Sequence, residues 1–482
     1  MSSKNPGQGC ALEFHVVDFS MATLSRSSSP NVFASGGESH APTELPRAIG
    51  TLGAIAIVVG TIIGSGIFMV PHDVALQVGS ISTVILVWVI GGVLALAGSL
   101  SLAELGAATP EAGGVYIYLR DAYGKLAAFL YGWAALLVIE SGGIATLAVA
   151  FSIYSSTFFP LTPLERKLVA SAVIALLTLV NIAGVRRASA VQTFFTLAKL
   201  TGLAIIVGFA LFAHHMAPVA PAPGYAPTHT TLSSFGVALI GVLWAYHGWH
   251  HLSHVAGEVK DPSKVLPRSF FVGALIVIFV YLSANLAYLR VLSLSVMAQD
   301  AYQRVAAKTM EILWGPQGAA FVSGLILCSM FGAINGNILG GARAIFAMAR
   351  DRVMFPAVGW IHPRFETPYV ALLIQGIWSI VLAAFGTFEQ LYTEVIFVGW
   401  IFYAAAALAV VILRRKRPQL ARPYHVWAYP VLPLAFAAAA LIIIINALAR
   451  SPRESGIGLG LVLLGIPIYL IWTRFPRTRQ SA

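Results

Sequence analysis

The chain has 482 residues, of which 58% are hydrophobic and only 10% are charged. Soluble domains are roughly 45–50% apolar and about 25% charged, so this composition excludes a soluble globular protein. A net charge of +11 would suit nucleic-acid binding, but most of the 30 Lys and Arg residues lie in short polar segments that share one side of a membrane topology. That bias follows the positive-inside rule and argues against a nucleic-acid partner.

The first 46 residues are rich in serine, glycine and proline and lack the basic-then-apolar pattern of a signal peptide. We expect residues 1–46 to form a disordered cytoplasmic tail. The chain has two cysteines, Cys10 in this tail and Cys328 in a later apolar run. Their placement indicates no disulfide framework.

Twelve apolar runs follow the tail, each of about 18 residues or more and long enough to cross a hydrocarbon core of about 30 Å. They lie near residues 48–74, 81–105, 124–152, 166–184, 190–214, 231–257, 269–290, 318–349, 368–386, 390–413, 426–449 and 455–473. The sequence therefore predicts an all-α polytopic membrane protein with twelve transmembrane helices. The positive-inside rule places both termini, including the tail at 474–482, in the cytoplasm.

The first run contains the stretch Gly60-Thr-Ile-Ile-Gly64-Ser65-Gly66-Ile67-Phe68. Glycine costs about 1 kcal/mol relative to alanine in a helix interior, so we expect the helix to unwind here. Hydrocarbon cannot satisfy the freed backbone groups, so an unwound segment must line an enclosed cavity or bind a polar ligand. The alternative is that the glycines only allow close helix packing.

The sixth run carries a second polar interruption at residues 244–249, five runs after the first. Because five is an odd number, a second half that repeats the first is inverted in the membrane. Paired broken helices in inverted repeats are typical of secondary transporters. We predict repeat 1 at 47–214, repeat 2 at 231–413 and two flanking helices at 426–473. Residues 112–124 and 295–315 are expected to form amphipathic surface helices.

Four groups of motifs stand in a characteristic order. They are GTIIGSGIF at 60–68, WAYHGW at 244–249 with EVKDPSKVLP at 258–267, FGAINGNILGGARAIFAMARD at 331–351 and LRRKRPQLARP at 413–423. Over about residues 47–425 the chain resembles the amino acid–polyamine–organocation superfamily and, within it, the L-type amino-acid transporters and their bacterial relatives. The resemblance implies a LeuT-type 5+5 inverted repeat with helices 1 and 6 broken, and alternating access as an amino-acid exchanger or facilitator.

An amino acid carries a carboxylate and an ammonium, and both are costly to desolvate without partners. The N–H groups around Ser65 are expected to bind the carboxylate at a helix N-terminus. Free carbonyls near Ile62 and in the sixth run would hold the ammonium. The predicted substrate-binding residues are Ile62, Gly64, Ser65, Gly66, Ile67, Gly143, Trp244, Ala245, His247 and Trp400.

The resemblance places Trp244 at an aromatic gate, whereas a membrane tryptophan is by default an interfacial anchor. His247 departs from the family pattern, in which many members have glycine and some that prefer cationic substrates have an acid. A histidine is neutral or positive, so we expect Lys and Arg to be poor substrates. His247 could also make transport pH dependent, or be a structural histidine.

Three further histidines, His250, His251 and His254, are spaced like metal ligands, but the local sequence has no paired carboxylate or thiol. We therefore expect no metal site and no cofactor.

Lys199 is the one Lys or Arg placed deep in an apolar run, and an intramembrane charge is by default a functional hypothesis. The resemblance puts a lysine beside the unwound first helix and the eighth helix, where sodium-coupled relatives bind an ion. An ammonium there would replace sodium, so we predict sodium-independent transport, with Lys199 hydrogen-bonded to backbone carbonyls. Snorkelling to an interface is the alternative.

Glu140 is a second charge inside a run, and it could couple protons or pair with a charge elsewhere. Tyr281 matches a family tyrosine near the unwound first helix, and Phe397 matches a pocket-wall aromatic. The predicted gating and coupling residues are Trp244, Lys199, Tyr281 and Glu140.

The leading interpretation is a secondary-active, sodium-independent exchanger of neutral amino acids in the cell membrane. A proton-coupled symporter and, further off, a non-transporting amino-acid receptor are the alternatives. No paired carboxylate, nucleophile elbow or metal motif indicates an enzyme. Eukaryotic members of the resembled family carry a cysteine after the third helix for a disulfide to a glycoprotein. Residues 152–166 contain none, so we expect no disulfide-linked heavy chain.

Overall fold

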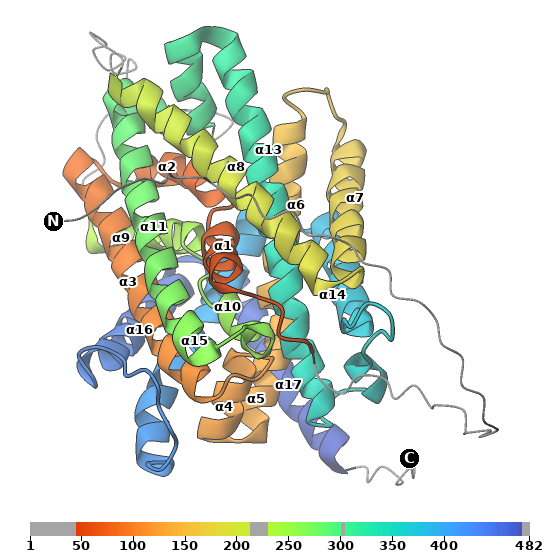
Figure 1. Cartoon of the computed structure of the whole chain (residues 1–482). Coiled ribbons are helices and arrows are strands. Elements are labelled where there is room, and N and C mark those ends of the chain that lie inside the picture. Colours follow the sequence, from red (N-terminus) through yellow and green to blue (C-terminus); the bar gives the residue numbers. More distant parts are fainter. Residues whose placement is uncertain (1–44, 213–229, 300–303, 475–482) are drawn as a thin grey trace, which may run out of the picture. The chain divides into compact units, whose positions relative to one another are not determined.

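The computed structural model describes residues 45–212, 230–299 and 304–474. Within these ranges the chain forms helices and no strand, apart from one isolated bridge between Ile49 and Val259 (Figure 1). Cys10, nearly all of the predicted N-terminal tail and all but the first residue of the C-terminal tail lie outside the described residues. So do residues 300–303 of the predicted surface segment at 295–315.

The helices follow one another with short connections. In chain order they are α1 (Thr51–Ile62), α2 (Gly66–Gln77), α3 (Ile81–Ala108), α4 (Val115–Tyr123), α5 (Lys125–Ala134), η1 (Ala135–Ile139), α6 (Glu140–Ser155), α7 (Pro163–Ile182), α8 (Val185–Phe212), α9 (Leu232–Ala245), α10 (His251–His254), η2 (Ala256–Glu258), α11 (Pro262–Val291), α12 (Leu294–Gln299), α13 (Val305–Arg350), η3 (Pro356–Gly359), α14 (Tyr369–Phe385), α15 (Phe388–Lys416), α16 (Val431–Arg450) and α17 (Pro452–Arg474).

Nine stretches of the described chain are long and apolar enough to cross a membrane. They are Thr51–Gln77, Ile81–Ala108, Lys125–Ser155, Val185–Phe212, Pro262–Val291, Val305–Arg350, Phe388–Lys416, Val431–Arg450 and Pro452–Arg474. α9 and α14 are apolar but shorter. The all-helical, polytopic class is therefore confirmed, while the count of twelve and the 5+5 repeat stay predictions.

Hydroxyl caps mark the start of several membrane helices. Ser80 caps α3 by accepting a hydrogen bond from the Thr83 N–H. Thr162, Thr231 and Thr387 begin α7, α9 and α15 in reciprocal capping boxes. Such caps satisfy N–H groups that a helix cannot pair internally, so they fix where these apolar segments enter helical geometry.

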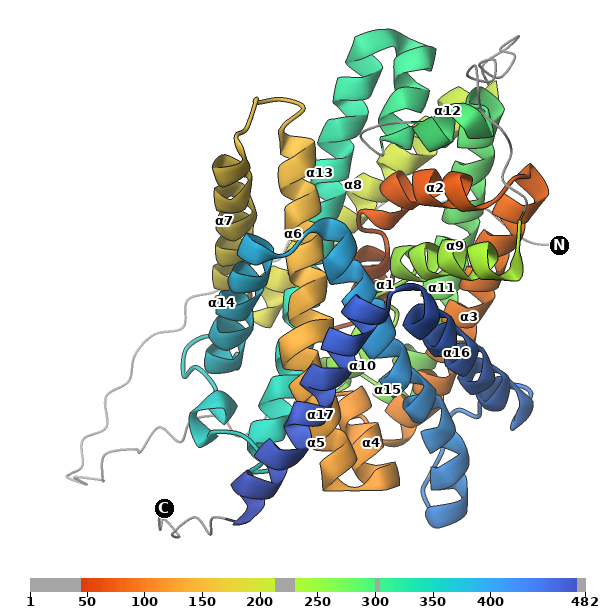
Figure 2. The same ribbon diagram turned by 180° about the vertical axis from the view of Figure 1, so that it is seen from behind.

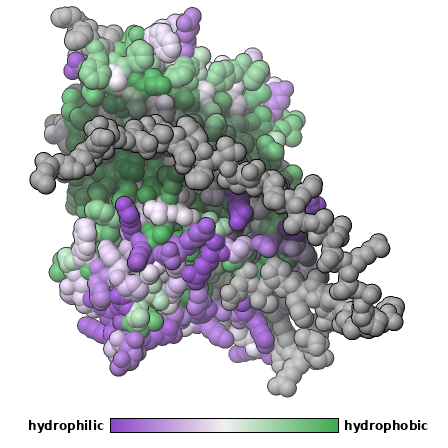
Figure 3. Space-filling model, in the orientation of Figure 1, coloured by the Kyte–Doolittle hydropathy of each residue, from purple (hydrophilic) through white to green (hydrophobic). Residues whose placement is uncertain are grey.

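Lipid-facing surface and protein interior are clearly separated. Large apolar side chains are exposed on α8, α11 and α14, where Phe194, Phe279 and Phe385 are 66%, 73% and 86% accessible. A soluble protein rarely exposes so many, whereas a bilayer accepts them. Figure 3 shows hydrophobic residues across the upper part of one face and hydrophilic residues gathered in its lower part.

The first membrane stretch lies innermost. Its most apolar window is 89% buried, against 17% for the corresponding window of Pro452–Arg474. α1 packs against α8, α11 and α13, while α14 packs along α7 at one edge in Figure 1 and Figure 2. The glycine-interrupted helix of the sequence analysis is thus enclosed by protein rather than by lipid.

Two carboxylate–arginine pairs hold helix ends together. Arg343 of α13 donates from Nε and Nη2 to the two oxygens of Glu258, at 2.8 and 3.1 Å, and both side chains are fully buried. Arg414 of α15 binds Glu104 of α3 in the same bidentate way, at 2.8 and 2.7 Å. A buried charge of this kind is tolerated because its partner is present.

Replacing Glu258 by Gln leaves the Arg343 charge buried without its counter-charge. We expect a loss of about 3–5 kcal/mol, seen as a lower midpoint of thermal unfolding in detergent, and partial recovery in Glu258→Gln/Arg343→Met.

Glu311→Gln is the matched control, because Glu311 pairs with Lys308 at 3.1 Å on the surface. Exposed pairs contribute about 1 kcal/mol or less. Equal midpoints for the two single variants would contradict this view of the Glu258–Arg343 pair.

Candidate functional site

The first membrane stretch is interrupted where the sequence predicts a break. α1 ends at Ile62, α2 begins at Gly66, and the residues between are not helical. The first N–H groups of α2 have no partner within the helix, and the last carbonyls of α1 likewise lack a partner within their own helix. Both sets of polar groups lie inside the protein.

A second break lies directly against the first. α9 ends at Ala245, and the chain turns through Gly248 at a φ of 114° before α10. The Thr61 hydroxyl donates to the Gly248 carbonyl at 3.0 Å. A Cβ atom at Gly248 would lie 2.8 Å from the carbonyl carbon of Thr61, so both the φ and the contact require glycine.

Tyr281 of α11 joins the two breaks. Its hydroxyl lies 2.8 Å from the Ala245 carbonyl and 3.1 Å from the Ile62 carbonyl, and it donates to this pair. The proximity of Tyr281 to the unwound first helix is as expected. Two carbonyls proposed for a substrate ammonium thus already accept one hydrogen bond, and each keeps a second lone pair.

Lys199 reaches the first break from α8. Its ammonium donates to the carbonyls of Gly60 and Ile63 at 2.9 and 2.5 Å and to that of Ser329 in α13 at 2.9 Å. The Ser329 hydroxyl also donates to Ile63, at 3.1 Å. The side chain of Lys199 is 1% exposed, so the predicted bonds to carbonyls are present and snorkelling is excluded.

A small cavity of about 10 Å³ lies between the breaks. A cavity of roughly 10–15 Å³ holds one water, so an amino acid enters only if these walls separate. The Ser65 hydroxyl is fully buried here and has no hydrogen-bond partner among the residues that the structure describes. The cavity is lined by Thr61, Ile62, Gly64, Ser65, Gly66, Leu147, Trp244, His247 and Asn337.

Not every predicted residue lies on this wall. Ile67 and Ala245 are adjacent in sequence to lining residues, and a Cβ atom at Gly66 would overlap Ala245, so Gly66 also serves close packing. Gly143 lies beside Asn337, since a Cβ atom there would be 3.3 Å from the Asn337 Oδ1. Trp400 stacks on Phe436 at a centroid distance of 5.3 Å, away from the lining.

Three lining residues were missed in the sequence: Thr61, Leu147 and Asn337. Thr61 stands inside the glycine stretch and could have been chosen for its hydroxyl. Asn337 stands in the family motif at 331–351 and could have been chosen for its amide, whereas Leu147 carries no local signal.

Trp244 closes one side of the small cavity. Its ring stacks on His247 at a centroid distance of 5.7 Å and on Tyr392 of α15 at 6.0 Å, and it is 5% exposed. This environment is not that of an interfacial anchor. Trp244 therefore forms an aromatic wall between α9 and α15.

Glu140 of α6 does not line the small cavity; it contacts the histidines that follow His247 in the sequence. Its Oε1 accepts a hydrogen bond from the His250 Nε2 at 3.1 Å, and its Oε2 lies 3.4 Å from the His251 Nδ1. The His254 Nδ1 is 3.8 Å from Oε1. The expectation of no metal site rested on a missing carboxylate; that premise is wrong for the fold, because α6 supplies one.

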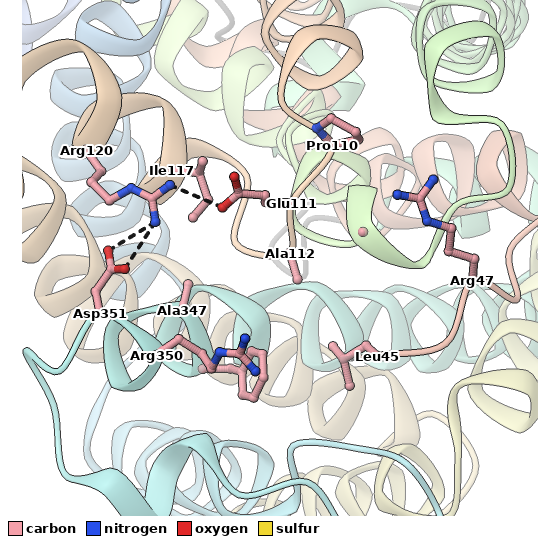
Figure 4. A pocket seen from close by; sticks show the side chains of 12 residues that line it. Leu45, Arg47, Pro110, Glu111, Ala112, Ile117, Arg120, Ala347, Arg350 and Asp351 are labelled. Carbon is pink, nitrogen blue, oxygen red and sulfur yellow. Dashed lines mark hydrogen bonds and ion pairs between the residues drawn. The ribbon is translucent and has the colours of Figure 1, made fainter. Parts of the chain in front are cut away.

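A larger cavity of about 650 Å³ opens near the ends of α4 and α13 (Figure 4). Arg120 bridges its wall, binding Asp351 at 3.1 Å and Glu111 at 3.1 Å. The Tyr116 hydroxyl donates to Asp351 at 3.0 Å, and burial together with this carboxylate raises the pKa of Tyr116. The tyrosine therefore stays a proton donor at neutral pH.

In the sequence, α10 lies between a residue that lines the small cavity and a residue that lines the large one. His247 lines the small cavity and Gly257 the large one. The Gly113 N–H donates to the His254 carbonyl at 2.9 Å, which ties the loop before α4 to α10.

Comparison with known proteins agrees with this arrangement. The profile of the amino acid permease family matches residues 49–468. The serine/threonine exchanger SteT of Bacillus subtilis is 32% identical, covering 88% of this chain and 96% of its own. The human large neutral amino acids transporter small subunit 2 is 33% identical over 92% and 85% of the two chains. The human Asc-type amino acid transporter 1 is 32% identical over 90% and 84%.

Two helix breaks meet at a buried polar cavity, and the family profile matches nearly the whole described membrane region. The chain therefore belongs to the amino acid permease family, as its motifs led us to expect.

Proposed function

We propose that the chain is a secondary-active, sodium-independent exchanger of neutral amino acids that works by alternating access in the cell membrane, with both termini cytoplasmic. Membership of the amino acid permease family supports amino-acid transport. Exchange is supported by the relative SteT, which is named a serine/threonine exchanger. The substrate leaves chemically unchanged, and no disulfide-linked partner is required.

The observation that carries sodium independence is the position of the Lys199 ammonium. It binds two carbonyls of the first break and one of α13, all at 2.9 Å or less. Carbonyl oxygens converging on a point are also the ligands of an alkali cation in transporters with broken helices. The Lys199 Nζ already fills this position and uses these carbonyls, so a sodium ion would have to displace it.

Neutral substrates are supported by the lining of the small cavity. Thr61, Ser65 and Asn337 offer hydrogen bonds, while Leu147 and Trp244 offer apolar surface. None of the nine lining residues is an acid, and a cationic side chain would be desolvated there without a counter-charge. The first N–H groups of α2 suit the carboxylate of a zwitterion.

Alternating access is supported by the two cavities. The large one lies beside Arg350, at the end of α13 that the positive-inside rule assigns to the cytoplasm. Trp244 lies between the small cavity and α15, and Gly257, which follows α10, lines the large cavity. Each barrier would open in turn around a substrate at the breaks.

The alternative, a proton-coupled symporter, differs in what drives accumulation. In proteoliposomes preloaded with unlabelled amino acid, exchange gives uptake that depends on internal substrate and is equal with and without a pH gradient. Accumulation driven by external acid into empty vesicles would favour the symporter, and binding without any counterflow would favour a receptor.

Lys199→Ala removes three charge-assisted hydrogen bonds, each worth about 1.5–3 kcal/mol, from the wall of the first break. We expect counterflow to fall at least about tenfold, since 1.4 kcal/mol suffices for that. The exposed Lys167→Ala is the control and should match the wild type. Wild-type uptake should be equal in NaCl and KCl; stimulation by sodium would overturn the proposal.

Arginine is expected to exchange at less than about a tenth of the rate of alanine or serine, because its guanidinium finds no carboxylate in the small cavity. A panel of twenty amino acids tested for efflux from preloaded vesicles checks this. Equal rates for arginine and alanine would contradict the assignment to neutral substrates.

Ser65→Ala separates a ligand role from a structural one. Removing a buried hydroxyl that has no partner should leave the unfolding midpoint unchanged or slightly raised, while a lost substrate hydrogen bond of about 0.5–1.5 kcal/mol weakens amino-acid binding roughly two- to tenfold. Binding is measured by scintillation proximity.

Ser99→Ala is the matched control, because the buried Ser99 hydroxyl donates to the Ala95 carbonyl away from the cavity. It should lose no affinity for substrate. Unchanged affinity in Ser65→Ala would remove this hydroxyl from the substrate site.

A further inference from the structure

Four buried side chains from two distant parts of the chain converge beside the small cavity. Glu140 comes from the start of α6. The other three come from α10 and the residue before it, and they are His250, His251 and His254. One ligand atom of each lies within 4.8 Å of all the others, and all four side chains are fully buried. We propose that this Glu–His cluster binds a divalent transition-metal ion of the zinc class.

The donor set suits such an ion. Three imidazoles and one carboxylate are ligands that zinc takes, whereas magnesium and calcium prefer oxygen. Bond lengths of about 2.0–2.1 Å in a tetrahedron place ligand atoms roughly 3.3 Å apart. The Glu140 oxygens lie 3.1, 3.4 and 3.8 Å from nitrogens of His250, His251 and His254, and the four ligand atoms lie within 4.8 Å of one another, so the ligands would move closer together around an ion.

Unpartnered polar atoms point to a ligand as well. Within the described part of the chain, the Oε2 of Glu140 and both ring nitrogens of His251 make no hydrogen bond although they are buried. A buried carboxylate is costly unless a positive charge compensates it, and its ion-pair contacts within the described chain are histidines alone. A dication coordinated by neutral imidazoles supplies that charge.

The surroundings orient the ligands and leave room for them. The Tyr131 hydroxyl binds the His254 Nε2 at 2.9 Å, which leaves Nδ1 for the cluster, a typical outer-shell contact. An ion on the His250 Nε2 would replace the 3.1 Å bond of that nitrogen with the Tyr403 hydroxyl. A Cβ atom at Gly340 of α13 would lie 2.6 Å from the His251 Nδ1, so larger residues would block the site.

A π turn directly before Glu140 affects the direction in which its carboxylate points. The five residues of η1 form a π turn directly before Glu140, whose N–H bonds to the Ala135 carbonyl five residues back. Such turns insert one extra residue into a helix and occur frequently at functional sites. The bound ion would link α6 to α10 beside the small cavity, whether or not the protein exchanges amino acids.

The test uses the full chain, purified with a histidine-free affinity tag from zinc-supplemented cells and washed with a chelator. We expect about one zinc ion per chain by plasma mass spectrometry in the wild type and less than about a tenth of that in Glu140→Gln and His251→Ala. His425→Ala removes an exposed histidine and should retain the ion. Equal zinc in wild type and Glu140→Gln would overturn the proposal.

A second measurement does not depend on the variants folding. Wild-type protein loaded with Co²⁺ should show the intense visible absorption of a tetrahedral centre, and its unfolding midpoint should rise with Zn²⁺ but not with Mg²⁺. Absence of both the band and the shift would also overturn the proposal and leave the cluster as a hydrogen-bonded or protonated group.

Discussion

The constraint on which the rest of this structure depends is that backbone polar groups at membrane depth find partners inside the protein. Two helices break side by side, so the unpaired carbonyl and N–H groups of both breaks need hydrogen-bond partners in the same part of the protein. Thr61, Lys199 and Tyr281 each donate to a carbonyl at or beside a break, and Ser329 adds another donor. The breaks are therefore stabilised by side chains from α1 itself and from neighbouring helices, and residues of both breaks line one small cavity.

The sequence alone could predict what depends on local composition. Glycines around Ser65 marked the first break, apolar runs marked most helices, and a lone intramembrane lysine marked Lys199 as a functional candidate, which the family resemblance placed beside that break. Contacts between distant helices carry no such local signal. Glu140 is far in sequence from His251, and Leu147 and Asn337 reach the cavity only because α6 and α13 pack against the first stretch.

Several charges inside this protein are paired in ion pairs that join helices, and none of the residues that line the small cavity is an acid or a lysine or arginine. The Glu258–Arg343 pair follows the α10 segment directly, and Glu104 gathers the ends of α3 and α15. Between them, the lining of the small cavity holds no acid and no permanent cation. A zwitterion, whose two charges can be met by backbone dipoles, is the kind of solute that such a region accepts most readily.

The π turn at Ala135–Ile139 has a consequence for related sequences. Each residue of an α-helix advances the side-chain direction by about 100°, so a homologue that lacks one residue ahead of Glu140 would keep a continuous, equally apolar helix and yet turn the acid away from the histidines. A hydropathy profile would not distinguish such a homologue from this chain. The number of residues in this helix, and not only their kind, decides whether α6 and α10 remain in contact through their polar groups.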